Sequence, residues 1–343
     1  MISPDTLIGE IVTNHPGVEA VFGAHGLPCS GCHVSTRESV RGGAAVHHLD
    51  LEVLLEDVRR FVADGTVPPP RPKPGASAKT PPPERQKKAG IEHVVAIMSG
   101  KGGVGKSLVT GLLAVALRRR GYAIGILDAD ITGPSIARLF GVTRRPYEGP
   151  DKKPHPPQST TGIQIMSMNL ILDNEAQAVI WRGPMVSGAI RQFYMDLEWG
   201  AVDYLLVDLP PGTSDAPLTV LQALPVSGVV LVSTPQGLAT MIVSKAIKLV
   251  QQLNVPIIGL VENMAYFADP DSGKRHDLFG ASKGVQLVVE SGAPLLAQLP
   301  IDPRLTQLCD DGRIEEYESA DYDVLATNFL KVLPALAVQR SGR

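Results

Sequence analysis

The stretch that decides the fold is Gly100-Lys101-Gly102-Gly103-Val104-Gly105-Lys106-Ser107, which follows the apolar run His93–Met98. It satisfies the pattern G-x-x-x-x-G-K-[ST], which forms a phosphate-binding P-loop when a strand precedes it and a helix follows it. The apolar run predicts the strand, and Ser107–Arg120 predicts the helix. Backbone N–H groups of such a loop surround phosphate oxygens at the helix N-terminus. The stretch therefore predicts an ATP site that also binds Mg²⁺.

Side chains in and beyond the loop complete the expected site. We expect Lys106 to reach the β- and γ-phosphates and the Ser107 hydroxyl to bind Mg²⁺. Asp128 and Asp130 follow one later apolar run, and Asp208 follows another in YLLVDLPPG, at the position of a Walker-B carboxylate. Carboxylates there can hold Mg²⁺ directly or through water, and one of them can orient the attacking water.

Outside the loop, apolar runs alternate with helical stretches. The runs predict strands at His93–Met98, Tyr122–Leu127, Ile163–Met168, Tyr204–Leu209, Gly228–Ser233 and Pro256–Val261. The helical stretches are Ser107–Arg120, Pro184–Met195, Ala216–Leu224 and Leu238–Leu253. This alternation predicts an α/β fold with a doubly wound, mostly parallel sheet covered on both faces. Ligands bind at the carboxyl ends of the strands in such sheets, where the motifs fall.

The chain divides at a proline-rich segment. Eight prolines lie between Pro68 and Pro83, and residues 67–90 carry six Lys or Arg against one Glu. This composition predicts an extended spacer. Apolar residues at helical spacing before it predict a small all-α unit. We therefore expect a small helical C-x-x-C domain over 1–67, a linker over 68–90 and a P-loop ATPase domain over 91–343.

The composition limits the function classes. The chain has 32 Lys and Arg against 35 Asp and Glu, a net charge of −3, which argues against a strongly electrostatic binder of nucleic acid or membrane. No apolar run reaches the roughly 18–20 residues of a membrane-spanning helix. The start MISPDTLIGEIV lacks the basic region of a secretory signal. We therefore expect a cytoplasmic protein that binds neither nucleic acid nor a membrane.

The second lysine of the loop, Lys101, departs from an ordinary P-loop. With it, KGGVGK at Lys101–Lys106 resembles the deviant Walker-A class of ATPases. In that class the extra lysine crosses a dimer interface to the partner's nucleotide, so the resemblance implies a homodimer that ATP closes. It also implies a magnesium-side role for Asp128 and a water-orienting role for Asp130.

Within that class, the chain resembles the Mrp-type iron–sulfur cluster carriers, also called ApbC, from about residue 91 to 335. The matching motifs are SGKGGVGKS, LDADITGPSIARLFG, WRGPM, DYLLVDLPPGTSDAPLT, STPQGLAT and GLVENMAYF. The resemblance implies an ATPase that binds a labile cluster and passes it to apo-proteins. It further implies that Asn263 recognises the adenine.

The chain departs from that family at one point. The family has C-P-x-C after ENM-x-x-F, where two subunits supply four thiolates to a cluster. Here Asp269 and Ser272 replace those two cysteines, and cluster iron prefers thiolate. The usual cluster site is therefore absent. A solvated loop is the simpler interpretation of residues 269–277, with a hard-cation site as the alternative.

The N-terminal segment HGLPCSGCHVST offers a second thiol pair, Cys29 and Cys32. Residues 1–67 resemble a small domain found fused to, or encoded beside, redox and hybrid-cluster proteins. Two subunits would offer four thiolates, the number a [4Fe–4S] cluster takes. A reversible disulfide, zinc bound with His33 or His25, and an inert structural pair remain open.

Three functions follow from these patterns. The first is an ATP-hydrolysing, homodimeric iron–sulfur carrier whose metal-handling cysteines lie in the N-terminal domain. The second is a positioning or partitioning ATPase that acts by binding a surface, for which the chain lacks a basic amphipathic C-terminal helix. The third is a nucleotide-dependent redox regulator with the Cys29/Cys32 pair as its sensor.

Overall fold

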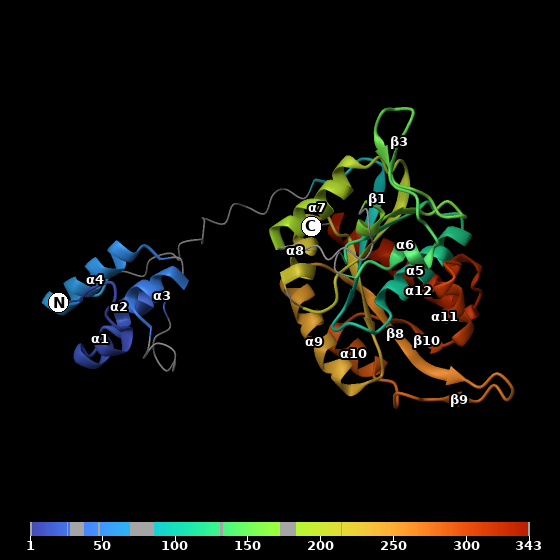
Figure 1. Cartoon of the computed structure of the whole chain (residues 1–343). Coiled ribbons are helices and arrows are strands. Elements are labelled where there is room, and N and C mark those ends of the chain that lie inside the picture. Colours follow the sequence, from blue (N-terminus) through green and yellow to red (C-terminus); the bar gives the residue numbers. More distant parts are fainter. Residues whose placement is uncertain are drawn as a thin grey trace. The chain divides into compact units, whose positions relative to one another are not determined.

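The computed structural model describes residues 2–25, 27, 38–46, 49–68, 86–130, 133–171, 183–213 and 215–341. The chain forms two compact units, Met1–Pro82 and Pro83–Arg343. The first is built of helices and the second is an α/β unit (Figure 1). Among the described residues, no helix is long and apolar enough to cross a lipid bilayer.

The described residues of the N-terminal unit form four helices, α1 (Ile8–Asn14), α2 (Glu19–Ala24), α3 (Val40–Val46) and α4 (Leu51–Asp64). Asp50 begins α4 by accepting hydrogen bonds from two backbone N–H groups of the first turn, the usual way to satisfy free donors there. Apolar side chains from the helices form one core: Ile8, Ile11, Val18, Val21, Phe22, Val40, Ala44, Leu54, Leu55 and Val58. Inside this unit the His25 Nε2 atom lies 2.9 Å from Asp57 Oδ2, and both side chains are buried.

The second unit is built on a parallel sheet in the order β10-β8-β7-β1-β6-β2-β5. Its strands are β1 (Ile91–Ser99), β2 (Ile124–Asp128), β5 (Gln164–Met166), β6 (Val202–Asp208), β7 (Gly228–Ser233), β8 (Ile257–Ala268) and β10 (Leu295–Ile301). Strand β1 lies between β6 and β7, so the segment that follows β1 begins in the middle of the sheet. The predicted doubly wound, mostly parallel fold is confirmed.

Helices cover both faces of this sheet (Figure 1). One apolar cluster holds residues of α5 (Lys106–Arg119), α6 (Ile136–Leu139), α11 (Pro303–Asp310) and α12 (Ala320–Ser341). The other holds residues of α7 (Gly183–Asp196), α8 (Asp215–Ala223), α9 (Gly237–Gln252) and α10 (Gly284–Ser291). Within β1, Val95 and Ile97 belong to the first cluster and Ala96 and Met98 to the second, as the two-residue period of a strand requires.

The structure extends the predicted sheet at one edge. Strand β8 runs to Ala268, well past the expected end at Val261, and pairs there with β9 (Arg275–His276) in an antiparallel hairpin. Strand β10 and the short pair β3 (Tyr147–Glu148) and β4 (Pro154–His155) were not predicted. The expectation of a solvated loop at 269–277 was therefore partly wrong, because the exposed residues there include a hairpin turn and a strand.

Candidate nucleotide-binding site

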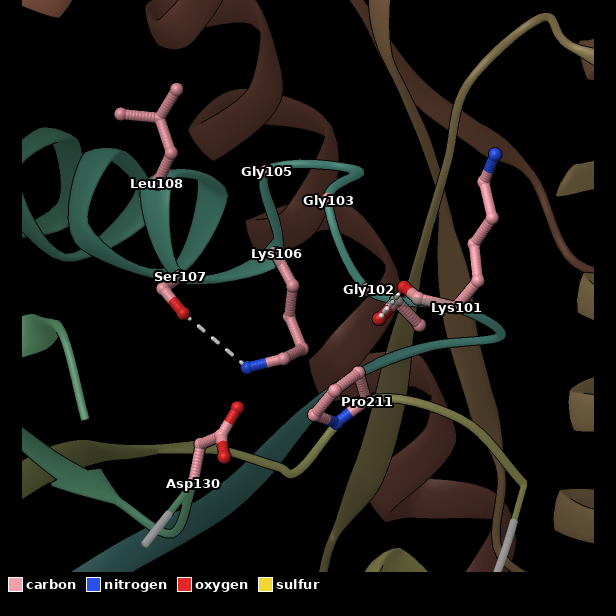
Figure 2. A pocket seen from close by; sticks show the side chains of 10 residues that line it. Lys101, Gly102, Gly103, Gly105, Lys106, Ser107, Leu108, Asp130 and Pro211 are labelled. Carbon is pink, nitrogen blue, oxygen red and sulfur yellow. Dashed lines mark hydrogen bonds between the residues drawn. The ribbon is translucent and has the colours of Figure 1, made fainter. Parts of the chain in front are cut away.

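The loop Gly100–Ser107 joins the end of β1 to the start of α5, as predicted, and lines a cavity of about 210 Å³ (Figure 2). Gly103 and Gly105 have φ values of 79° and 78°, a left-handed conformation that glycine adopts without strain. A Cβ on Gly105 would lie 2.3 Å from the Asn263 Nδ2 atom, and one on Gly100 would lie 2.7 Å from the carbonyl carbon of Ile242. Glycine is therefore favoured by φ at positions 103 and 105, and required at position 100 by the close approach of the α9 backbone.

Lys106, Ser107 and Thr110 converge on the buried carboxylate of Asp208. The Lys106 Nζ atom lies 2.7 Å from Asp208 Oδ1, and the Ser107 hydroxyl donates to Asp208 Oδ2 at 2.5 Å. The Thr110 hydroxyl donates to Asp208 Oδ1 at 2.9 Å. Sequence reasoning placed the first two residues with Asp208 but missed Thr110, although its position one turn after Lys106 puts both on one helix face.

Asp128 ends strand β2 beside Asp208, its register partner on β6. Its Oδ1 accepts from the Asp130 N–H at 3.2 Å, and its Oδ2 accepts from Ser135 N–H, Ile136 N–H and the Ser167 hydroxyl at 3.0–3.1 Å. Protein donors therefore already use both oxygens. Oδ2 accepts three hydrogen bonds and Oδ1 only one, so a contact to Mg²⁺, directly or through water, would use Oδ1.

Burial, followed by the charge of Asp208, raises the pKa of Asp128 from 3.8 to about 7. The folded protein thus holds a proton that the unfolded chain releases, so this group stabilises the fold at low pH. The contribution is complete below pH 3.8 and is lost as the pH rises to about 7.

We expect Asp128→Asn to gain stability relative to the wild type as the pH rises from 5 to 8. The amide has no charge to bury, so it escapes the penalty that the ionised carboxylate acquires in that range. Thermal melts of nucleotide-free, Mg²⁺-free protein at both pH values measure this difference. The exposed Asp271 supplies a control, Asp271→Asn. If the melting temperatures of the wild type and Asp128→Asn changed by the same amount between the two pH values, the prediction would be contradicted.

Asp130 lines the cavity on the side opposite the glycines (Figure 2). It is 9% exposed, and its Oδ1 accepts a hydrogen bond from the Gly133 N–H at 3.3 Å. The carboxylate therefore faces the space in front of Lys106 and Ser107, where a substrate phosphate and an attacking water would lie. Its water-orienting role stays a prediction.

Two further predicted residues contact the loop from other elements. The Asn263 amide lies on β8 and donates from Nδ2 to the Val104 carbonyl at 2.9 Å. It is buried against the loop, and its expected contact with adenine stays a prediction. The Lys101 ammonium donates to Gln236 Oε1 at 2.8 Å. It lies away from Lys106, whose ammonium points toward Ser107 and Asp130 (Figure 2).

The donors at this site fit Mg²⁺ and a triphosphate. The Ser107 hydroxyl and the Asp208 carboxylate are hard oxygen ligands that already lie together, and Mg²⁺ is held by few protein oxygens plus waters and substrate phosphates. The glycine-rich turn exposes backbone to the cavity, and α5 begins at Lys106, so its N-terminus favours an anion. These residues would hold the metal and the phosphate chain together.

Asp269 and Ser272 form the tip of the β8–β9 hairpin. Asp269 Oδ1 accepts from the Ser272 N–H and from the Ser272 hydroxyl, each at 2.7 Å, and these bonds lower the pKa of Asp269. The turn is thus closed by its own side chains. In the part of the chain that the structure describes, no group of three or more His, Cys, Asp or Glu side chains could hold a metal ion.

Cys29 and Cys32 lie outside the described residues, as does His33. The last described residues before them are His25 and Leu27, and Leu27 is buried in the core of the N-terminal unit. Sequence reasoning considered His25 as a zinc ligand, but the structure places its Nε2 against Asp57. That contact occupies one ring nitrogen.

Comparisons with known proteins agree with this geometry. A carrier from Clostridium perfringens named "Iron-sulfur cluster carrier protein" is 45% identical over 234 residues, 66% of this chain and 82% of the relative. One of the same name from Synechocystis is 37% identical over 89% of each chain. A nucleotide-binding protein from Archaeoglobus fulgidus, solved with ADP, is 44% identical over 68% of this chain and 90% of its own, with a TM-score of 0.61.

Two family matches divide the sequence. Residues 2–55 match a domain of unknown function, DUF1858. Residues 90–336 match the ParA family, described as "NUBPL iron-transfer P-loop NTPase". That match covers most of the chain, and the two carriers above align with this chain over 234 and 323 residues. The chain therefore belongs to the ParA family of iron-transfer P-loop NTPases.

Proposed function

We propose that this protein is an ATP-hydrolysing iron–sulfur cluster carrier that works as a nucleotide-gated homodimer and delivers clusters to apo-proteins. The observation that carries the ATPase part is the convergence of Lys106 and Ser107 on the buried Asp208 at the P-loop. The carrier part is supported by relatives of that name at 37–45% identity. The expected cytoplasmic location stays a prediction.

The chain's own residues suffice to bind and orient the triphosphate. Lys106 supplies a positive charge at the floor of the cavity, and exchanging its partner Asp208 for phosphate oxygens keeps that charge paired. Mg²⁺, when bound, neutralises charge on the β- and γ-phosphate oxygens. Asp130 lines the cavity, and in this proposal it orients the water that attacks the γ-phosphorus and releases ADP and phosphate.

We assign the cargo site to the N-terminal domain. The hairpin tip at Asp269 and Ser272 offers one carboxylate and one hydroxyl, already bonded to each other, and these are poor ligands for cluster iron. Cys29 and Cys32 supply the thiolate pair that the hairpin lacks. The working division is a thiol-bearing domain over 1–67, a linker over 68–90 and an ATPase domain over 91–343.

The same hairpin observation favours one second candidate. A chain without cluster thiolates on its ATPase domain could instead be a redox-regulated ATPase, with Cys29 and Cys32 forming a reversible disulfide. A positioning or partitioning role has less support. The MinD protein from Pyrococcus horikoshii, solved with Mg-ADP, is 20% identical with a TM-score of 0.50, and this likeness shows the fold alone.

Cluster transfer tests the proposal directly. We expect the full chain, reconstituted anaerobically with iron and sulfide, to activate an apo-enzyme that requires a [4Fe–4S] cluster, and to do so faster than free iron and sulfide. Client activity is the readout, and a chelator that traps free iron separates direct transfer from release. Reconstituted protein that never activates the client in the presence of the chelator would contradict a carrier function.

A further inference from the structure

The two lysines of the P-loop have different partners within the chain. Lys106 is buried and lies 2.7 Å from Asp208. Lys101 extends away from the phosphate side of the cavity, and its ammonium donates to Gln236 Oε1 at 2.8 Å (Figure 2). One lysine is therefore ready to bind phosphate, and the other is held by an amide of a different element.

Gln236 is well fixed to act as this acceptor. It is the residue before α9, and its carbonyl accepts the Thr240 N–H at 3.2 Å in the first turn of that helix. Its side chain makes no capping hydrogen bond to the helix, so the amide oxygen can serve Lys101. The start of α9 also packs against the loop, because a Cβ on Gly100 would lie 2.7 Å from the Ile242 carbonyl carbon. Donor and acceptor thus sit on elements in direct contact.

We infer that Gln236 is a positioning residue that holds Lys101 in a resting position, and that this bond must break when two copies close around ATP. The inference rests on the proposed nucleotide-gated homodimer. A neutral amide oxygen gives a charge-assisted hydrogen bond without an opposing charge. The anionic phosphates of ATP offer a stronger partner, so the lysine can exchange one for the other.

The bond makes dimer closure harder in a predictable way. Each of the two protomers must release its own Lys101 before the dimer can close. The fraction of protomer pairs that can close is therefore the square of the fraction of chains with a released lysine. If about one fifth of the chains have a released lysine, the apparent dimer dissociation constant is about 25-fold weaker than for freely available lysines. Removing the Gln236 acceptor should therefore lower the apparent dimer dissociation constant by about the same factor.

Two substitutions should therefore act in opposite directions. Gln236→Ala removes the acceptor, and we expect the ATP-bound dimer to form at roughly 10- to 25-fold lower protein concentration. Gln236→Glu turns the hydrogen bond into an ion pair, and we expect dimerisation to need a higher concentration than in the wild type. A residue that only supported the start of α9 would not give opposite shifts, since an acidic side chain at a helix N-terminus stabilises the helix.

Sedimentation of the full chain over a range of concentrations, with Mg²⁺ and a non-hydrolysable ATP analogue, measures these shifts. Lys101→Ala is the matched background, in which adding Gln236→Ala should shift nothing further. Thermal melts check folding, and Gln236→Asn, whose amide is one methylene shorter, replaces Gln236→Ala if that variant does not fold.

The outcomes separate the two proposals. Opposite shifts that disappear in the Lys101→Ala background support the role of Gln236. A wild type that dimerises with the analogue, with variants that shift in the same direction or not at all, overturns that role and leaves the gated dimer standing. A wild type that stays monomeric with the analogue overturns the gated dimer and the role of Gln236 together.

Discussion

Lys106→Ala is expected to abolish ATP hydrolysis and to weaken nucleotide binding by about 100-fold or more. The Lys106 side chain is 6% exposed and its Nζ atom lies 2.7 Å from Asp208 Oδ1, so its buried positive charge would meet the phosphates. Loss of one group that stabilises transition-state charge costs about 10²–10³ in rate. Here the loss is compounded, because the buried Asp208 carboxylate would lose the ammonium that lies 2.7 Å from it beside the phosphate site.

The same substitution should also lower the stability of the nucleotide-free protein. Removing one partner of a buried ion pair costs about 3–5 kcal/mol, because the other charge stays buried without compensation. Adding Asp208→Asn removes that charge and should recover part of the melting temperature, but none of the hydrolysis. This pair of variants separates a folding defect from a catalytic one.

Lys101→Ala is the matched control for these measurements. Lys101 bonds to Gln236 outside the phosphate side of the cavity, so this variant should still bind ADP while losing hydrolysis that depends on a closed dimer. Titration with a fluorescent ADP analogue gives the binding, and phosphate release gives the rate. Hydrolysis at the wild-type rate in Lys106→Ala would show that the P-loop is not the site.

The P-loop was predictable because its function depends on local geometry. The glycine spacing, the lysine and the following hydroxyl lie within eight residues, and the strand before them and the helix after them have clear apolar patterns. Asp128 and Asp208 were predictable for a related reason, since parallel strands bring their carboxyl ends to one edge of the sheet. The roles assigned to these residues stay predictions.

The contacts that sequence reasoning missed come from tertiary packing. The Gln236 amide meets Lys101 across 135 positions of sequence, and no spacing rule joins a helix start to a loop that far away. Ser167 reaches Asp128 across 39 positions for the same reason. Strand β10 was missed because Pro294 directly precedes its short apolar run and Pro300 interrupts it, and proline usually argues against a strand inside a sheet. Proline at 300 is tolerated here in a strand at the sheet edge.

Replacing both Cys29 and Cys32 with serine is expected to remove bound iron and sulfide almost completely. If two copies supply four thiolates to a [4Fe–4S] cluster, the reconstituted wild type should hold about four irons per dimer and the variant close to none. Iron, sulfide and zinc analysis after anaerobic purification, with an absorption spectrum, measures the change. Nucleotide binding should survive in the variant, because Lys106, Ser107 and Asp208, which carry the expected phosphate and Mg²⁺ contacts, are unchanged.

A second variant in that background sharpens the test. Asp269→Cys/Ser272→Cys places a thiol pair at the hairpin tip, where the Asp269 and Ser272 side chains already meet at 2.7 Å. Iron regained by this variant would show that the hairpin tip of the ATPase domain lacks only the thiolate ligands for a cluster. A wild type that stays free of iron after reconstitution, but whose two N-terminal thiols oxidise and reduce reversibly, would contradict the carrier and support the redox-regulated ATPase. Zinc bound by the wild type and lost with the cysteines would point instead to a structural metal, since zinc has no redox chemistry.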